Sequence, residues 1–232
     1  MRVMQLSSPA PIGAHPLRSV TRPPVAPADD ELLLQVSTCA VCRTDLQIVE
    51  GDIAMRRSPV VPGHQVVGRV VATGRRVEGW RVGDRAGVAW LAGACGRCPR
   101  CVSGRENLCE QAEFIGWDRD GGYATEMTVR ASFALRMPDQ FDDAEAAPLL
   151  CGGVIGYRAL KASGIQPGQL LGLYGFGASA TLALQVARHW GCRVFVCTRS
   201  RAEQARALAL GAEWAGGYDN AVPELYRPAL WA

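Results

Sequence analysis

Four cysteines that lie close together carry the clearest chemical pattern of the chain. Two residues separate Cys95 from Cys98 and Cys98 from Cys101, and Cys109 follows after seven more. Four thiolates can surround one Zn²⁺ tetrahedrally, at about 2.3 Å each. The pattern therefore predicts a structural zinc site, because a closed shell of four cysteines leaves no open coordination position for chemistry.

Two other interpretations fit part of this pattern. An iron–sulfur cluster shares the first two gaps, but the bacterial ferredoxin run has three residues before its last cysteine and a proline after it. Here the gap is seven residues and Glu110 follows. Disulfide pairing is disfavoured, because the nine cysteines are an odd number and disulfide frameworks are typical of small secreted domains.

The composition limits the classes of protein to which this chain can belong. The chain has 232 residues, of which 48% are hydrophobic and 20% charged, so we expect one or two folded domains and not a disordered chain. Its 25 basic residues, all arginine except Lys161, are scattered and nearly balanced by 22 acids, which disfavours nucleic-acid binding. No apolar run of membrane-spanning length and no signal peptide appear, so we expect a cytoplasmic protein without membrane partners.

The pattern of apolar and turn-forming residues changes near residue 150. Before it, short valine-containing runs separated by glycine and proline predict a mostly β domain, with strands at 31–36, 65–71 and 85–90. After it, strand and helix patterns alternate, which predicts a parallel α/β sheet. The strands of this second region are expected at 170–174 and 193–198 with a third starting at Trp214, and the helices at 179–190 and 202–210.

A glycine motif lies between the first strand and the first helix of the second region. Gly175, Gly177 and Ala180 form a G-x-G-x-x-A pattern. The first glycine permits a tight turn, the second lets the backbone approach a pyrophosphate, and the alanine lets the helix pack on the strand. Since N–H groups at a helix N-terminus bind phosphates, the motif predicts a dinucleotide site.

The end of the next strand bears on which dinucleotide is bound. NAD-binding chains carry an acidic residue about 20 residues after the motif, where it binds the ribose hydroxyls. This chain has Thr198, Arg199 and Ser200 there, with no carboxylate among them. Arg199 could pair with a 2′-phosphate and Ser200 could hydrogen-bond it, so NADP is favoured over NAD. The alternative is a surface arginine that caps the following helix.

Taken in order, these motifs make the sequence similar to the zinc-dependent medium-chain alcohol dehydrogenases. The resemblance rests on the four cysteines, the glycine motif, and the runs 39–45 (CAVCRTD), 62–68 (PGHQVVG), 83–85 (GDR) and 150–153 (LCGG). It implies an α/β plus β fold class: a chaperonin-10-like (GroES-like) domain over 1–150, with a zinc lobe at about 93–110. Residues 151–232 would then be the first half of a Rossmann domain, incomplete.

The resemblance also implies a second zinc, held by Cys42, His64 and Cys151. Two cysteines and one histidine leave a fourth position open, as a catalytic zinc requires. The implied activity is the reversible oxidation of a small alcohol to an aldehyde or ketone, with hydride transfer to NAD(P). Family members are expected to form homo-oligomers.

Further roles follow from the resemblance alone. Thr44 would pass the alcohol proton outward, Asp45 would orient a ligand histidine, and Arg43 would contact the cofactor phosphates. Trp90 is either a pocket wall beside the zinc or a core residue. Many relatives have glutamate where this chain has Gln65, so we expect altered zinc-ligand exchange.

Two expectations concern the proton path and the chain end. Gln47 stands where many relatives end their proton relay with histidine, and it cannot titrate, so we expect proton release directly to water. A dinucleotide fold needs two β-α-β-α-β halves, and the chain supplies one. Its last dozen residues show no helix or strand pattern, so we expect a truncated or frame-shifted product. The alternative to the enzyme is therefore a zinc-binding remnant without turnover.

Overall fold

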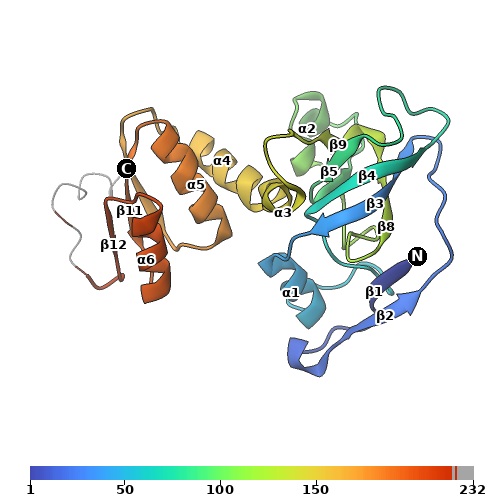
Figure 1. The fold of residues 1–232 in the computed structure, drawn as a ribbon, viewed down its shortest axis with the longest axis horizontal. Helices are drawn as coiled ribbons and strands as arrows, with labels where there is room; N and C mark the ends of the chain where they lie inside the picture. Colours follow the sequence, from blue (N-terminus) through green and yellow to red (C-terminus); the bar gives the residue numbers. More distant parts are fainter. Residues whose placement is uncertain (221–222, 224–232) are drawn as a thin grey trace. The chain divides into compact units, whose positions relative to one another are not determined.

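The computed structural model describes residues 1–220 and Pro223. The chain divides into two compact units, Met1–Cys151 and Gly152–Ala232 (Figure 1). Each unit has its own buried apolar clusters. Among the described residues, no helix combines the length and apolar character that crossing a membrane would require.

The first unit is built around a five-stranded antiparallel sheet in the order β8-β3-β4-β5-β9. Alternate residues of its central strands point into one core, so that Leu32 and Leu34 of β3 pack with Val66 and Val70 of β4 without solvent exposure. The strands are β3 (Glu31–Cys39), β4 (Val66–Thr73), β5 (Arg85–Val88), β8 (Glu126–Arg130) and β9 (Ala134–Arg136).

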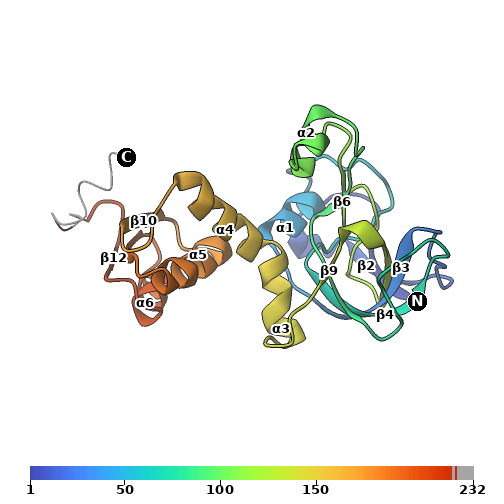
Figure 2. The same ribbon diagram turned by 90° about the horizontal axis from the view of Figure 1, so that it is seen from above.

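Smaller elements surround this sheet, as Figures 1 and 2 show. They include two antiparallel strand pairs, β1 with β2 and β6 with β7. Their bounds are β1 (Arg2–Leu6), η1 (Ile12–Ala14), β2 (Leu17–Thr21), α1 (Arg43–Glu50), β6 (Leu91–Gly93), α2 (Pro99–Val102), η2 (Glu106–Leu108), β7 (Glu113–Phe114), η3 (Ala131–Phe133), α3 (Asp143–Ala146) and η4 (Ala147–Leu150).

The second unit contains a three-stranded parallel sheet in the order β10-β11-β12. Val194 and Val196 of β11 are fully buried against Leu184 and Ala187 of α5. The elements are α4 (Gly152–Ser163), β10 (Leu170–Tyr174), α5 (Ala178–His189), β11 (Arg193–Cys197), α6 (Arg201–Ala209) and β12 (Trp214–Gly216).

The predicted alternation of strand and helix in this unit is confirmed within one residue at most ends. The helix α4 was not predicted, because its sequence opens with three glycines in five residues, and glycine disfavours helix. One of them, Gly156, lets α4 pack against α5: a side chain there would meet Ala183 and the carbonyl of Ser179. Tertiary packing thus overrides local propensity.

In the first unit, strands were correctly expected at 31–36 and 65–71, and β3 and β4 cover them. The single strand expected at 85–90 was wrong in its last two residues. Strand β5 ends at Val88, and the chain turns at Trp90 before β6 begins at Leu91. The expectation for the last dozen residues lies outside the described part of the chain, apart from Pro223.

Candidate metal centres and dinucleotide loop

The structure brings together three residues that lie far apart in the sequence. Ligand atoms of Cys42, His64 and Cys151, the three-donor site, lie within 4.8 Å of one another. The two sulfur atoms are 3.9 Å apart. Tetrahedral geometry with Zn–S bonds of 2.3 Å would separate two sulfurs by about 3.8 Å. The donor set and its spacing therefore fit a zinc ion with one open position.

Local structure places each of these donors. Cys42 is the N-cap of α1, and its N–H donates to Asp45 Oδ2 at 2.8 Å. His64 follows Gly63, whose φ of 96° is a conformation that residues with side chains rarely adopt. A side chain at Gly63 would also collide with the ring of Tyr123. Cys151 directly follows the short helix η4.

Asp45 hydrogen-bonds to the histidine. Its carboxylate is buried, and Oδ1 accepts hydrogen bonds from the Gly63 N–H at 3.1 Å and from His64 Nδ1 at 3.0 Å. Because Nδ1 is occupied, His64 Nε2 is left as the ligand atom. The structure thus gives Asp45 the contacts that its expected role needs.

The three donors differ in the direction in which their pKa values are shifted. Hydrogen bonds from the Cys151 thiol and from His64 lower the pKa of Cys42 to about 4, and the same contact raises the pKa of Cys151. Burial would lower the pKa of His64, but hydrogen bonds to Asp45 and Cys42 outweigh it and raise this pKa to about 9. Of the two sulfurs, Cys42 is therefore the one that favours the thiolate.

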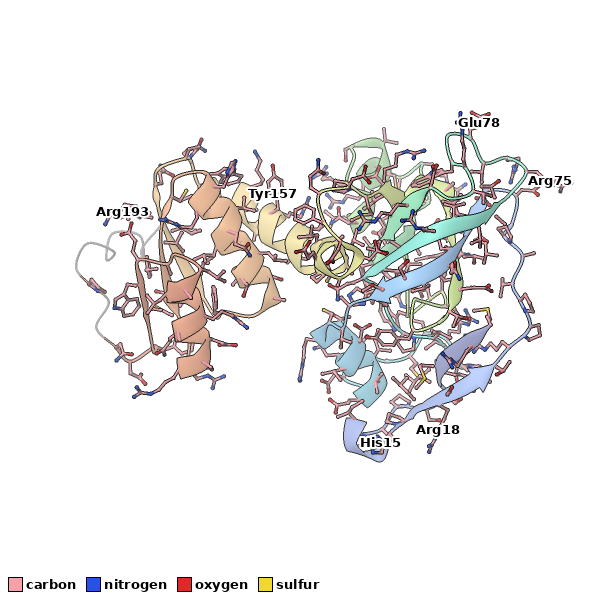
Figure 3. All side chains as sticks on the ribbon, in the orientation of Figure 1. His15, Arg18, Arg75, Glu78, Tyr157 and Arg193 are labelled. Carbon is pink, nitrogen blue, oxygen red and sulfur yellow. The ribbon has the colours of Figure 1, made fainter. Side chains whose placement is uncertain are left out.

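Other residues expected at this site differ in their contacts. The hydroxyl and the N–H of Thr44 also lower the pKa of Cys42, which favours its thiolate. Gln65 is buried, and its amide donates to the carbonyl of Ala40 at 3.3 Å. Arg43 is exposed. The two other histidines, His15 (Figure 3) and His189, are exposed as well.

An aromatic stack lies beside His64. The Trp90 ring meets the imidazole edge-on, with centroids 4.9 Å apart, and stacks on Phe114 and Trp117 at 5.1 and 6.0 Å. The guanidinium of Arg56 lies 3.8 Å from the Trp117 centroid. Of these three rings, only Trp90 was expected beside the zinc, because nothing local to Phe114 or Trp117 in the sequence indicates that they stack on it.

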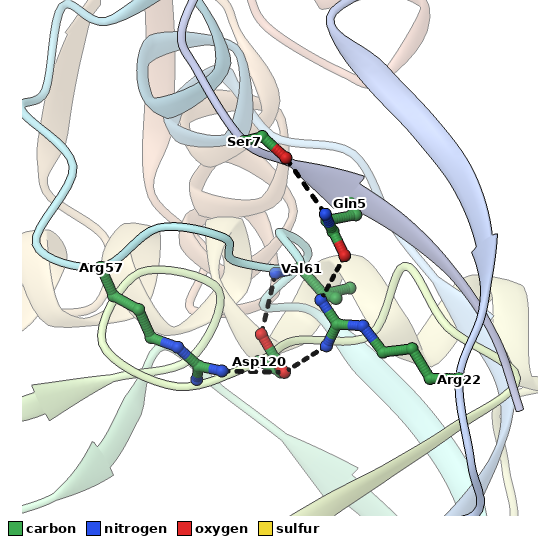
Figure 4. A network of polar contacts seen from close by, with 6 residues as sticks. All are labelled: Gln5, Ser7, Arg22, Arg57, Val61 and Asp120. Atoms are coloured by element: carbon green, nitrogen blue, oxygen red, sulfur yellow. Dashed lines mark hydrogen bonds and ion pairs between the residues drawn. The ribbon is translucent and has the colours of Figure 1, made fainter.

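A polar network supports the segment that leads to His64 (Figure 4). Asp120 Oδ2 forms ion pairs with Arg22 at 2.8 Å and Arg57 at 3.3 Å. Its other oxygen, Oδ1, accepts the Val61 N–H at 2.9 Å. Arg22 also donates to Gln5, which ties the network to strand β1. Sequence reasoning did not identify Asp120.

Four sulfurs form a second cluster, the four-cysteine site (Cys95, Cys98, Cys101 and Cys109), with all sulfurs within 4.8 Å of one another. Cys101 Sγ lies 3.9 Å from Cys95 Sγ and 3.5 Å from Cys98 Sγ, again near the tetrahedral edge of about 3.8 Å. Backbone N–H groups of Cys95, Cys98 and Gln111 donate to sulfur atoms of the cluster. Such donors stabilise thiolates, so this donor set also fits zinc.

The glycine motif forms the turn expected of it. Gly175 has a φ of 84°, and Gly177 is the N-cap of α5. A side chain at either glycine would meet nothing, so the backbone is open on that side. The first turn of α5 holds no acidic residue, and Ala180 packs against the core of the second unit. The loop can therefore offer N–H groups to a phosphate.

The end of β11 differs from expectation in one respect. Arg199 is exposed, and Ser200, not the arginine, caps α6 by accepting the Glu203 N–H at 3.3 Å. None of the three residues is acidic, but a carboxylate reaches this strand end from α6. Glu203 lies three residues into the helix, where side chains reach back to the cap, and its carboxylate accepts the Thr198 hydroxyl at 2.5 Å.

Comparison with known proteins places these features in a family. The alcohol dehydrogenase GroES-like domain matches residues 28–139. The protein named "Probable alcohol dehydrogenase AdhA" of Mycobacterium tuberculosis (strain CDC 1551 / Oshkosh) is 47% identical over 217 residues, which cover 91% of this chain and 63% of that protein. An alcohol dehydrogenase of Geobacillus stearothermophilus is 39% identical over 198 residues, 85% of this chain and 58% of the relative. The chain thus spans about three fifths of the length of these relatives.

Solved structures agree with the sequence relatives. A cobalt- and zinc-bound thermostable alcohol dehydrogenase from Pyrobaculum aerophilum has a TM-score of 0.84 at 28% identity, over 93% of this chain and 65% of that one. A cinnamyl alcohol dehydrogenase from Sorghum bicolor has a TM-score of 0.82 at 29% identity, over 91% and 63%. The predicted fold class, a GroES-like β domain followed by a partial Rossmann domain, is confirmed. The chain therefore belongs to the medium-chain alcohol dehydrogenase family.

Proposed function

We propose that this chain carries the zinc-binding part and the first half of the cofactor-binding part of an alcohol dehydrogenase. The reaction is the reversible oxidation of a small alcohol to an aldehyde or ketone, with hydride transfer to NAD(P). The observation that carries the proposal is the meeting of Cys42, His64 and Cys151, with ligand atoms within 4.8 Å. Two thiolates and one imidazole are a donor set of catalytic zinc sites.

The proposal assigns different tasks to the two metal centres. The four-cysteine site would hold one zinc for stability, since four protein donors fill the tetrahedral shell. A zinc ion in the three-donor site would supply Lewis-acid polarisation to the substrate oxygen. Asp45 keeps His64 in the tautomer that presents Nε2, and the two sulfurs balance the charge of the cation.

Thr44 is the residue proposed to receive the alcohol proton. Thr44 follows Cys42 by two residues and lowers the pKa of its thiol, which ties it to this proposed zinc donor. A hydroxyl can donate and accept at once, which lets it pass a proton onward. The next polar residue on this path, Gln47, does not titrate, so we expect the proton to leave directly to water.

For the cofactor, we propose that the pyrophosphate binds the loop from Gly175 to Ala180, with Arg43 as a further phosphate contact. NADP is favoured over NAD because Arg199 is exposed at the end of β11, and the Glu203 carboxylate is engaged by Thr198. Arg199 and Ser200 would then bind the 2′-phosphate. Comparing kcat/KM with the two cofactors tests this preference, and a clear advantage for NAD would overturn it.

The function itself is tested on one preparation of the full chain. Zinc content, NADPH binding and aldehyde reduction are measured together, with Cys42→Ser as the control for the three-donor site. The proposal expects two zinc ions per chain, NADPH binding and turnover that Cys42→Ser abolishes. Two zinc ions without cofactor binding or turnover would favour a zinc-binding protein with no enzymatic activity.

A further inference from the structure

Tyr123 carries a buried hydroxyl that the function described above does not use. The oxygen is shielded from solvent and completes no hydrogen bond of ordinary geometry within the described residues. An unsatisfied buried polar group destabilises the fold, so natural proteins rarely keep one without a role. Phenylalanine would fill the same space without this penalty. The hydroxyl therefore calls for a physical explanation.

The backbone around Tyr123 is fixed against the segment that carries His64. The Tyr123 N–H donates to the Pro62 carbonyl at 3.0 Å, and the Gly122 N–H donates to the Gly63 carbonyl at 2.8 Å. The Tyr123 ring fills the space that a side chain at Gly63 would take. The ring is thus held directly beside the residue that precedes the histidine.

Asp45 and Tyr123 both lie at Gly63: Asp45 Oδ1 accepts the Gly63 N–H at 3.1 Å, and the Tyr123 ring fills the space beside the Gly63 α-carbon. Burial raises the pKa of Tyr123, and the Asp45 carboxylate raises it further, through its charge and by attracting the phenolic proton. Asp45 already accepts two backbone N–H groups and His64 Nδ1. Since a carboxylate offers about four acceptor positions, one remains for another donor.

We propose that Tyr123 is a positioning residue of the three-donor site: its hydroxyl donates to Asp45 and thereby fixes the carboxylate that orients His64. The inference rests on the proposed zinc site. Residues that hold metal-ligating histidines in place typically change metal affinity 10- to 100-fold when they are altered. Tyr123 would act one contact further out, through Asp45.

The test replaces Tyr123 by phenylalanine, which removes only the hydroxyl. Zinc release from the full chain to a chromogenic chelator is followed over time. We expect zinc from the three-donor site to leave about 10-fold faster in Tyr123→Phe than in the wild type. Release from the four-cysteine site in the same chain should not change. Tyr157→Phe, which removes a hydroxyl from a half-exposed tyrosine of the second unit, is the matched control.

A double-mutant cycle with Asp45→Asn separates positioning from packing. If Tyr123 acts through Asp45, adding Tyr123→Phe to Asp45→Asn should change zinc release by less than twofold. Additive effects, or unchanged release in the single variant, would overturn the inference. If the wild type retains only one zinc, the proposed three-donor zinc site is refuted. Thermal unfolding of the metal-free chain then tests whether the Tyr123 hydroxyl donates to Asp45. A Tm lowered by several degrees supports the hydrogen bond, whereas an unchanged or raised Tm refutes it.

Discussion

The two metal centres of the first unit are built in opposite ways. The four-cysteine site takes all its donors from one loop between Cys95 and Cys109, next to small elements such as α2 and η2. The three-donor site takes its donors from the start of α1, from the segment before β4 and from the end of η4. We therefore expect the first loop to depend on a bound ion, whereas elements packed on the sheet position the second set of donors.

This difference predicts that loss of metal has unequal consequences. In the four-cysteine loop, the buried residues are mainly cysteines with Ala112 beside them, so little apolar area remains when the ion is absent. Around the three-donor site, Asp45, His64 and several valines of β4 are buried in the packed interior of the first unit. Four variants test the comparison.

The largest effect is expected from Cys101→Ser. Cys101 is buried and contacts two other sulfurs of its cluster, so the variant should lose that zinc and the order of the lobe. Structural zinc binding is coupled to folding, and we expect a loss of about 4 kcal/mol or more in unfolding free energy. Chemical denaturation and limited proteolysis of residues 93–112 measure it. A stable lobe with one zinc per chain would contradict the comparison.

Cys151→Ser should remove zinc from the three-donor site and leave the sheet folded. We expect one zinc per chain, a loss of activity of at least about 10³-fold because the Lewis acid is gone, and a much smaller loss of stability than in Cys101→Ser. Zinc analysis and circular dichroism provide the measurements. Unfolding of the whole first unit would mean that this site, too, depends on its ion for structure.

Asp120→Asn tests whether the ion pairs of Asp120 help to hold the donors of the three-donor site in place. The amide oxygen can still accept the Val61 N–H, but both arginines lose their charged partner. We expect a loss of about 1 kcal/mol, since these pairs are partly exposed, and faster zinc release from the three-donor site alone. Asp29→Asn is the control, because its arginine partners are highly exposed. Equal effects of the two variants on zinc release would count against long-range support.

The smallest effect is expected from Gln65→Glu. Gln65 is buried directly after His64, and a carboxylate there adds negative charge near the metal. We expect zinc exchange at the three-donor site to change a few-fold, with two zinc ions per chain retained. Isotope exchange and steady-state kinetics measure it, and unchanged values for both would refute the idea.

The same contrast explains what the sequence could predict. The cysteines from Cys95 to Cys109 are near neighbours, so their spacing alone indicates a metal site. No spacing relates Cys42 to Cys151, and only the family resemblance linked them. The contacts of Asp120 and Tyr123 could not be predicted from the sequence, because they depend on pairing with residues 61–63, about 60 positions earlier.

In the second unit, local patterns predicted the strands and helices well, because β10, α5, β11 and α6 follow one another closely. The exceptions arise from packing and from helix geometry. The glycine-rich start of α4 becomes helical only because α5 covers it. Glu203 reaches the end of β11 because α6 begins immediately after Ser200.

The place of Cys151 at the very end of the first unit bears on how the protein is made. During translation, the fourth cysteine of the lobe emerges about 40 residues before Cys151 does. At roughly 5–20 residues per second, this interval lasts several seconds. The nascent chain can thus load its first zinc and close the lobe while Cys42 and His64 still lack their third partner. Metal incorporation would then be vectorial, with the structural ion entering before the catalytic one.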